Sequence, residues 1–478
     1  MLFMINLLLV LSEENLKNHI YYLANDYLEG RLCGYNQKAR DYIKFYLNRM
    51  GYEVLTQNFE VEGKIKIDSF YTNLKIPIKP LYFSSSGYIK TKDISIVDGD
   101  SLDEIGMINK AIEERNKKKK IIIFLVSNYI QKSYFKKDLG IIALQTLKTY
   151  KDSLNKKEIE VYLKLSKEKV QGENIFAIKK GKSLRYIVLG AHYDHLGYGD
   201  ISSLDGIYDV HNGADDNASG VAGVIEIANY YKDKEVRDNI LFAFWDCEEI
   251  GTVGSDYFVK NPIIPMENIK TYINFDMIGR LENNNLTIIG SKTAKEFEEI
   301  IKKVNEKFNF NIKFSNSGFG MSDQNAFYNM KIPVLHIFTN VHKDYHKTTD
   351  DPQFINYEGE KKILELTIEI IDEISKIEAL TYNEIKENRT IRNSNRVRLG
   401  VIPDYSYEGE GVKILDVSNG TPAQKSGLKK GDIILKIGDY EIKNIYDLTY
   451  ALTKFKKGQK TTIIFKSNDK VIKKQVIF

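Results

Sequence analysis

Short apolar runs that alternate with amphipathic stretches are the feature that most limits how this chain can fold. Residues 186–189, 240–245, 272–275 and 333–338 are almost continuously apolar, and helical patterns lie between them. Apolar runs of this length are typical of strands that are buried on both faces of a parallel sheet. The alternation therefore predicts an α/β sandwich built around a mixed, mostly parallel sheet.

Metal-ligating residue types follow these runs. His192 and Asp194 come at the end of the first run, Glu248 and Glu249 follow the second, and Asp276 follows the third. In such sheets ligands bind beyond the carboxyl ends of the strands, and imidazole and carboxylate groups are usual zinc ligands. The pattern therefore predicts a metal site at this edge, and one bridging carboxylate would allow two metals.

The acidic pair Asp215 and Asp216 lies in a loop before a predicted helix, and His346 follows the last apolar run. A carboxylate in that loop is well placed to bridge two cations. Glu248 and Glu249 can divide two roles, because one can bind metal while its neighbour takes a proton from water. A single aspartate here would more often be a cap or turn residue, but six ligand-type residues in this order favour a metal site.

Five segments together carry a family resemblance. They are residues 22–31 (YLANDYLEGR), 190–223, 245–255 (WDCEEIGTVGS), 274–280 (NFDMIGR) and 344–350 (DYHKTTD). Over about residues 12–60 and 171–380 the chain resembles the M28 family of di-zinc aminopeptidases. The chain has Ser322-Asp323-Gln324 where family members often have Ser-Asp-His.

The resemblance implies a role for each site residue. Asp215 would bridge two Zn²⁺ ions, His192 and Asp276 would complete one site, and Glu249 and His346 would complete the other. Glu248 would be the general base, Asp194 would orient His192, and Tyr345 would donate to the oxyanion. Asp216 would lie just outside the ligand set, joined to Asp215 by a cis peptide bond. The resemblance assigns no function to the remaining histidines. From their positions in the sequence, His195 and His211 are expected to support the ligands, to line the pocket or to be ordinary loop residues. His336 is expected to be a hydrogen-bonded core histidine, and His19 and His342 surface or structural residues.

We therefore expect a zinc-dependent aminopeptidase that acts on peptides. A glutaminyl cyclase-like acyltransferase with one zinc, a carboxypeptidase-type exopeptidase and a non-catalytic scaffold remain alternatives. Counting bound zinc separates the cyclase from the peptidase, and peptides with blocked N-termini separate the two exopeptidases.

A second resemblance covers the C-terminal part of the chain. Residues 398–401, 411–415 and 420–435 resemble a PDZ domain, which implies that Leu399, Gly400 and Val401 supply backbone N–H groups to a peptide carboxylate. A spacer or oligomerisation module is the alternative. The expected organisation is residues 1–60 (the first part of the catalytic domain), 61–170 (a β-rich insert resembling a protease-associated or lid subdomain), 171–382 (the catalytic domain), 383–396 (a linker) and 397–478 (the PDZ domain).

Composition excludes some partners and leaves the compartment open. A net charge of +4 over 478 residues argues against a nucleic-acid binder. Two cysteines, Cys33 and Cys247, exclude a disulfide framework, and Cys247 is expected to be a small buried hydrophobe. Residues 2–11 are apolar, and a degenerate export signal and a packing segment are equally good interpretations. No stretch predicts a transmembrane span, and an extracytoplasmic or cell-envelope location is slightly favoured over the cytoplasm.

Overall fold

The computed structural model describes residues 11–478 except 103, 130–138, 155–157, 200–201, 206, 321, 386–396, 404–406, 408–409, 418–419, 443–446, 449–450, 453, 457 and 469. The described residues form two compact units. One is made mainly of residues up to 59 and from 171 onward, and the other of residues 60–170. The segment interpreted as an export signal or packing segment, and most of the expected linker at 383–396, lie outside the described residues.

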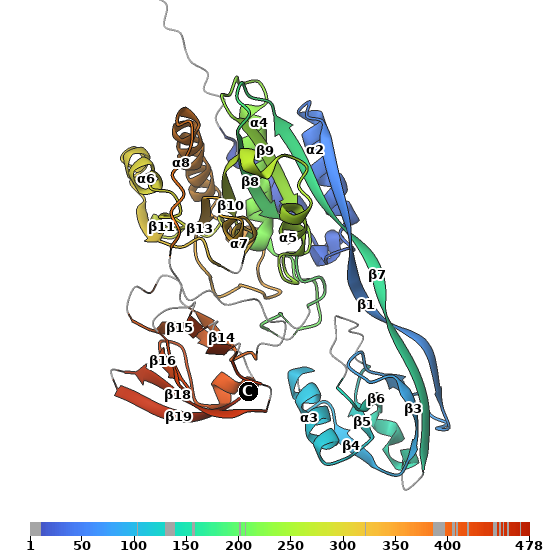
Figure 1. The fold of residues 1–478 in the computed structure, drawn as a ribbon. Helices are drawn as coiled ribbons and strands as arrows, with labels where there is room; N and C mark the ends of the chain where they lie inside the picture. The colour runs from blue at the N-terminus through green and yellow to red at the C-terminus, as the bar shows by residue number, and fades with distance from the viewer. Residues whose placement is uncertain are drawn as a thin grey trace, which may run out of the picture. The chain divides into compact units, whose positions relative to one another are not determined.

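The largest sheet has nine strands, counted over the described residues (Figure 1). Its strands in spatial order are β1 (Val54–Thr72), β7 (Ile159–Lys179), β9 (Asn239–Trp245), β8 (Tyr186–His192), β10 (Ile269–Phe275), β13 (Val334–Phe338), β11 (Asn285–Ile289) and β12 (Asn311–Ser315), and β3 (Gly87–Thr91) pairs with β7. Strands β9, β8, β10 and β13 are mutually parallel, whereas β7 and β11 run antiparallel to their neighbours β9 and β13. The predicted mixed, mostly parallel sheet is confirmed.

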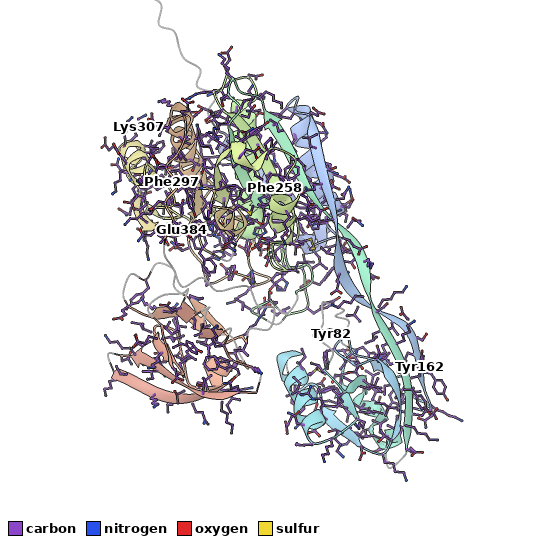
Figure 2. The ribbon with its side chains drawn as sticks, viewed as in Figure 1. Tyr82, Tyr162, Phe258, Phe297, Lys307 and Glu384 are labelled. Atoms are coloured by element: carbon purple, nitrogen blue, oxygen red, sulfur yellow. A yellow bond between two sulfur atoms is a disulfide. The ribbon has the colours of Figure 1, made fainter. Side chains whose placement is uncertain are left out.

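Helices cover both faces of this sheet. One face shares a hydrophobic core with α1 (Glu13–Leu23), α2 (Gln37–Arg49), α4 (Gly220–Tyr231), α6 (Phe297–Asn305) and α8 (Tyr357–Lys376). The other face packs against α5 (Val253–Lys260) and α7 (Gln324–Asn329). Phe297 on α6 and Phe258 on α5, both labelled in Figure 2, belong to these two separate cores. Strands covered on both faces must be apolar throughout, which explains the continuous runs in the sequence.

Local signals set the ends of several helices. The Ser12 side chain accepts a hydrogen bond from the Asn15 N–H at the start of α1, and Asn356 does the same for Gly359 at the start of α8. These side chains satisfy N–H groups that have no partner within the helix. Short helical turns complete the fold: η1 (Asp26–Arg31), η2 (Lys148–Leu154), the π-helical η3 (Ala214–Ser219), η4 (Met266–Asn268) and η5 (Pro352–Phe354).

The unit at residues 60–170 has a sheet of its own. Its strands are β2 (Lys79–Pro80), β6 (Ile142–Leu147), β5 (Ile121–Val126) and β4 (Ile94–Asp98), in that order. Strands β4, β5 and β6 are parallel, and α3 (Glu104–Asn116) contributes Met107 and Ala111 to the core on one face. Every residue of β5 is buried, so this strand lies inside the small sheet, between β6 and β4.

The C-terminal residues form a six-stranded sheet around a separate core, as far as the described residues go. Its strands run in the order β14 (Val401–Pro403), β15 (Val412–Val417), β16 (Ile433–Ile437), β18 (Lys460–Ser467) and β19 (Lys470–Ile477), with β17 (Tyr440–Glu441) paired to β16. The helix α9 (Pro422–Lys425) packs there as well. Its core includes Leu399, Ile434 and Phe465.

Cys33 and Cys247 form a disulfide bond. Cys247 is buried as expected, but the interpretation of it as a small hydrophobe missed its bond to Cys33. The two cysteines lie 214 residues apart in the sequence, so nothing in their spacing indicated a pair. They meet because the segment after η1 lies beside the segment after β8: Leu32 and His195 form an isolated parallel bridge, and His192 is in register with Trp245 on β9.

None of the helices among the described residues combines the length and the apolar character that are needed to cross a membrane.

Candidate metal centre

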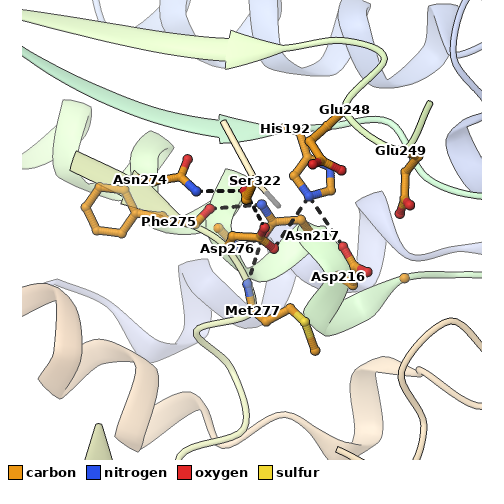
Figure 3. A network of polar contacts seen from close by, with 12 residues as sticks. His192, Asp216, Asn217, Glu248, Glu249, Asn274, Phe275, Asp276, Met277 and Ser322 are labelled. Atoms are coloured by element: carbon orange, nitrogen blue, oxygen red, sulfur yellow. Dashed lines mark hydrogen bonds and ion pairs between the residues drawn. The ribbon is translucent and has the colours of Figure 1, made fainter. Parts of the chain in front are cut away.

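The parallel strands bring the predicted ligand residues to one edge of the sheet. His192 ends β8, Asp276 directly follows β10, and Glu248 and Glu249 lie in the turn after β9 (Figure 3). Because β8, β9 and β10 run in the same direction, their carboxyl ends meet at the same edge. Asp216 reaches this edge from η3, the turn that precedes α4.

The first group of ligand atoms surrounds His192. Its Nε2 lies 3.4 Å from Oδ1 of Asp216 and 3.5 Å from Oδ1 of Asp276. Ser322 fixes the other oxygen of Asp276, because its hydroxyl donates to Oδ2 at 2.7 Å. The three residues meet the geometric requirement for a shared metal ion.

The second group surrounds His346. Its Nε2 lies 3.2 Å from Oδ2 of Asp216 and 3.3 Å from Oε2 of Glu249. The Nδ1 of His346 is 3.0 Å from the backbone carbonyl of Ser202, which fixes the orientation of the ring. Asp216 thus presents one carboxylate oxygen to each group.

These distances fit zinc. Zinc ligands lie about 2.0–2.2 Å from a tetrahedral ion, so two ligand atoms of one ion lie about 3.3–3.6 Å apart. The four N–O distances in the two groups fall between 3.2 and 3.5 Å. Neutral imidazole nitrogens combined with carboxylate oxygens are also the donor atoms that zinc prefers. The residues present therefore fit two zinc ions that share Asp216.

Asp215 does not join either group. Its Oδ1 accepts hydrogen bonds from the Gly279 N–H at 2.6 Å and the Ser219 hydroxyl at 3.0 Å. Its Oδ2 lies 3.2 Å from Nε2 of His342. The structure thus contradicts the bridging role that the resemblance gave to Asp215, because this side chain is already committed to the backbone after β10.

The cis peptide bond is also displaced from its predicted place. It joins Asp216 to Asn217, not Asp215 to Asp216, so the prediction was wrong by one residue. The position expected to lie just outside the ligand set is the one whose carboxylate faces both histidines.

Two buried side chains hold the turn that carries Asp216. Oδ2 of Asp350 accepts the backbone N–H groups of Asp215 and Asp216 at 2.9 and 3.0 Å. The guanidinium of Arg31 donates to the carbonyl oxygens of Asn212 and Gly213 at 2.6 and 3.0 Å. The backbone of the turn is thereby fixed from both sides.

The model of Peptidase family M28 matches residues 174–371, and the model of the PDZ domain matches residues 388–477. The chain carries an M28 peptidase domain followed by a PDZ domain.

Individual relatives cover less of the chain. It is 28% identical over 176 residues to a probable leucine aminopeptidase 2 of Arthroderma benhamiae, which is 35% of this chain and 33% of that protein. It is 32% identical over 144 residues to leupeptin-inactivating enzyme 1 of Streptomyces exfoliatus, which is 30% of this chain and 32% of that protein. The chain thus spans about a third of the length of these curated relatives.

A solved structure of a zinc aminopeptidase from Bacillus subtilis shares the fold. It aligns with a TM-score of 0.54 and 19% sequence identity, over 79% of this chain and 97% of that chain. The α/β sandwich of the M28 domain is thus the fold of that enzyme.

Within the M28 domain, Asp194 holds the turn after β9. Its Oδ1 and Oδ2 accept the backbone N–H groups of Glu248 and Glu249 at 2.9 and 3.3 Å. The Nδ1 of His192 lies 3.2 Å from the Asp194 carbonyl oxygen and 3.7 Å from its Oδ1. Asp194 therefore contacts both the first histidine and the two neighbouring glutamates.

The two glutamates differ in acidity. Burial raises the pKa of Glu248 well above its ordinary value, and the nearby carboxylates Asp323 and Glu249 act in the same direction. Burial also acts on Glu249, but the charge of His346 and the hydrogen bonds from His195 and His346 together outweigh it and lower the pKa of Glu249 to about 2. In Figure 3 Glu248 lies beside the His192 ring, with Glu249 farther along the turn. The M28 domain thus places a carboxyl that can hold a proton next to one that remains ionised.

Other predicted residues lie near this centre. The Tyr345 ring stacks on the His346 ring with centroids 3.9 Å apart. Nε2 of His336 is 3.4 Å from the Asp276 carbonyl oxygen. The ring nitrogens of His211 contact the Asp209 carbonyl oxygen and the Ser203 hydroxyl, both at 2.9 Å.

The structure brings two further histidines close to these residues, and the sequence predicted a definite function for neither of them. His342 lies beside Asp215. Nδ1 of His195 lies 2.7 Å from Oε1 of Glu249. The only sequence signal for His195 was its position next to Asp194, directly after the strand that ends in His192.

Proposed function

We propose that this protein is a zinc-dependent aminopeptidase that releases N-terminal residues from peptides. The observation that carries the proposal is the placement of Asp216, whose two carboxylate oxygens face two different histidine–carboxylate pairs. Asp216 would bridge two zinc ions. His192 and Asp276 would complete one site, and Glu249 and His346 the other.

Bound zinc would supply Lewis acidity, which polarises the scissile carbonyl and makes an attacking water more acidic. Glu248 would take the proton from that water and pass it to the leaving amine nitrogen. Tyr345 would donate a hydrogen bond to the developing oxyanion.

The same edge offers a reason for preferring free N-termini. Glu248, Asp276 and Asp323 are carboxylates that lie close enough to interact electrostatically. The oxygens of these carboxyl groups could accept hydrogen bonds from an entering ammonium group, whereas a peptide carboxylate has no proton to donate. The names of the relatives, a probable leucine aminopeptidase and a leupeptin-inactivating enzyme, support action on peptides or peptide-like molecules.

The test compares the wild type with Glu248→Gln. The wild type should bind two zinc ions per chain and hydrolyse leucine p-nitroanilide. Glu248→Gln should keep both ions and lose activity by about 10²–10⁴-fold, the usual contribution of a general base. The matched control is Glu369→Gln, which removes an ion pair between Glu369 on α8 and Lys307. This variant should retain full activity. Unchanged turnover of Glu248→Gln would overturn the assigned base, and a wild type without zinc would overturn the proposal.

The alternative activities give different results in the same assay. A glutaminyl cyclase-like enzyme would bind one zinc ion and cyclise N-terminal glutamine. A carboxypeptidase-type enzyme would cleave peptides with acetylated N-termini. The aminopeptidase should cleave only peptides whose N-terminus is free.

We further propose that the PDZ domain binds the C-terminus of a peptide through Leu399, Gly400 and Val401. The Leu399 side chain is buried in the domain core, which anchors the backbone at this point. The segment leads into β14, which lies at the end of the strand order and pairs with β15. An extended peptide could therefore add to the sheet beside β14, as in β-strand addition.

A further inference from the structure

His195 is a buried histidine beside the metal centre to which neither the resemblance nor the comparisons give a function. Its side chain is fully buried, and its Nδ1 lies 2.7 Å from Oε1 of Glu249. The other oxygen of Glu249, Oε2, is the one that faces His346 at 3.3 Å. His195 therefore holds Oε1 of Glu249, and Oε2 remains directed toward His346.

The distance decides between two functions for this ring. Two ligand atoms of one tetrahedral zinc ion lie about 3.3–3.6 Å apart, as the pairs around His192 and His346 do. The 2.7 Å between His195 and Glu249 is too short for that arrangement and matches a charge-assisted N–H···O hydrogen bond. His195 also lies with Asp216 and Glu249 in a group that meets the geometric requirement for a metal ion, but its short distance to Glu249 makes it a hydrogen-bond donor to that carboxylate.

The surroundings of the ring fix its position. A Cβ atom added at Gly213 would lie 2.5 Å from Cδ2 of His195, so the ring packs directly on this glycine in the turn before Asp216. The His195 N–H also donates to the Arg31 carbonyl oxygen at 3.1 Å. Among the described residues, Nε2 of His195 has no hydrogen-bond partner and is buried. The bond to Glu249 is thus the one polar contact found for the ring within the described residues.

We propose that His195 is a positioning residue that sets Glu249 for the second metal site. It donates Nδ1–H to Oε1 of Glu249, so that the carboxylate binds through Oε2 alone. This inference rests on the proposed function, because it concerns the zinc ion shared by Asp216, Glu249 and His346. Its consequence is selective: loss of His195 weakens the second zinc site and leaves the site of His192 and Asp276 intact.

The test is a zinc titration of metal-free protein by calorimetry, which resolves the two sites without any activity measurement. In His195→Ala, the affinity of one site should fall by about 10–100-fold, the usual cost of removing a group that orients a ligand. The affinity of the other site should not change. In His195→Asn, whose amide can donate from a position close to that of Nδ1, most of the lost affinity should return.

Two further variants separate positioning from a general effect on folding. His19→Ala removes another buried imidazole, which contacts Tyr42 and Glu226, and it should leave both affinities unchanged. If His195 acts through Glu249, the double variant His195→Ala/Glu249→Gln should bind zinc no more weakly than Glu249→Gln alone.

The outcomes are distinct. A folded His195→Ala protein with two zinc sites of wild-type affinity would overturn the positioning function, and so would a His195→Asn protein that is no better than His195→Ala. A wild type that binds no zinc would overturn the proposed function itself.

Discussion

At the residue scale, two neighbouring aspartates have different tasks. Asp216 faces both histidines, whereas Asp215 accepts the Gly279 N–H and the Ser219 hydroxyl.

Asp216→Asn should remove zinc from the protein, with a loss of affinity larger than the roughly 10–100-fold cost of altering an outer partner of a ligand. Asp215→Asn keeps one oxygen acceptor, so it should keep both zinc ions and lower the free energy of unfolding by about 1 kcal/mol. Metal analysis and urea unfolding of the two variants check this, and zinc loss in Asp215→Asn alone would reverse the assignment.

A second residue-scale prediction concerns pH. Asp205 accepts the Thr348 N–H and hydroxyl at 2.8 and 2.9 Å, and it joins the loop before His211 to the loop of His346. Burial opposes ionisation, but the hydrogen bonds from His211 and Thr348 outweigh it and hold the pKa of Asp205 well below its usual range.

Because the folded-state pKa is lowered, the ionised form stabilises the fold above the ordinary aspartate pKa of about 4 and this stabilisation is lost below it. The wild type should therefore be more stable than Asp205→Asn at pH 7, and the difference should shrink as the pH falls below about 4. Urea unfolding midpoints of both proteins at pH 7, 5, 4 and 3 measure it. A difference that does not depend on pH would contradict the assigned charge.

Four of the five side chains in the two groups around His192 and His346 were expected as ligands from the sequence, whereas Asp216 was not, and the reason for this difference is physical. The ligand types and their positions after β8, β9 and β10 follow from strand periodicity and from the parallel sheet. The choice between Asp215 and Asp216 depends on the backbone of η3, where two adjacent identical side chains point in different directions. The contact of His195 with Glu249 could not be predicted, because it joins residues 54 positions apart in sequence.

At the element scale, the disulfide between Cys33 and Cys247 joins the segment after η1 to the turn that carries Glu248. It closes a loop of 214 residues, and a cross-link of this kind typically stabilises a fold by about 2–4 kcal/mol. The double variant Cys33→Ser/Cys247→Ser should therefore unfold several degrees below the wild type.

Calorimetric scans with and without a reducing agent measure this effect. Reduction should lower the unfolding temperature of the wild type and leave that of the double variant unchanged. Equal unfolding temperatures for the oxidised wild type and the variant would show that the bond does not stabilise the protein.

The elements themselves were largely predictable. Continuous apolar runs identified β8, β9, β10 and β13, since strands covered on both faces cannot alternate with polar residues. The disulfide was not predictable, because two cysteines that are distant in sequence meet only when the whole sheet is assembled.

At the scale of the whole molecule, the chain combines an M28 peptidase domain with a PDZ domain. If the segment 399–401 receives a peptide carboxylate, peptides that end in an apolar residue with a free C-terminus should bind, and the same peptides with a C-terminal amide should bind at least about tenfold more weakly. Fluorescence anisotropy with both forms of each peptide on the full chain measures the difference. Equal affinity for acid and amide would contradict a carboxylate site and favour a spacer or oligomerisation module.

The central claim is that two cations share the side chain of Asp216. Anomalous diffraction at the zinc absorption edge, from crystals of the zinc-loaded protein, tests it most directly. Two peaks should appear about 3.5 Å apart, each about 2.0–2.2 Å from a different oxygen of Asp216. One peak belongs beside His192 and Asp276, and the other beside Glu249 and His346. A single peak, or two peaks that contact Asp215 in place of Asp216, would contradict it.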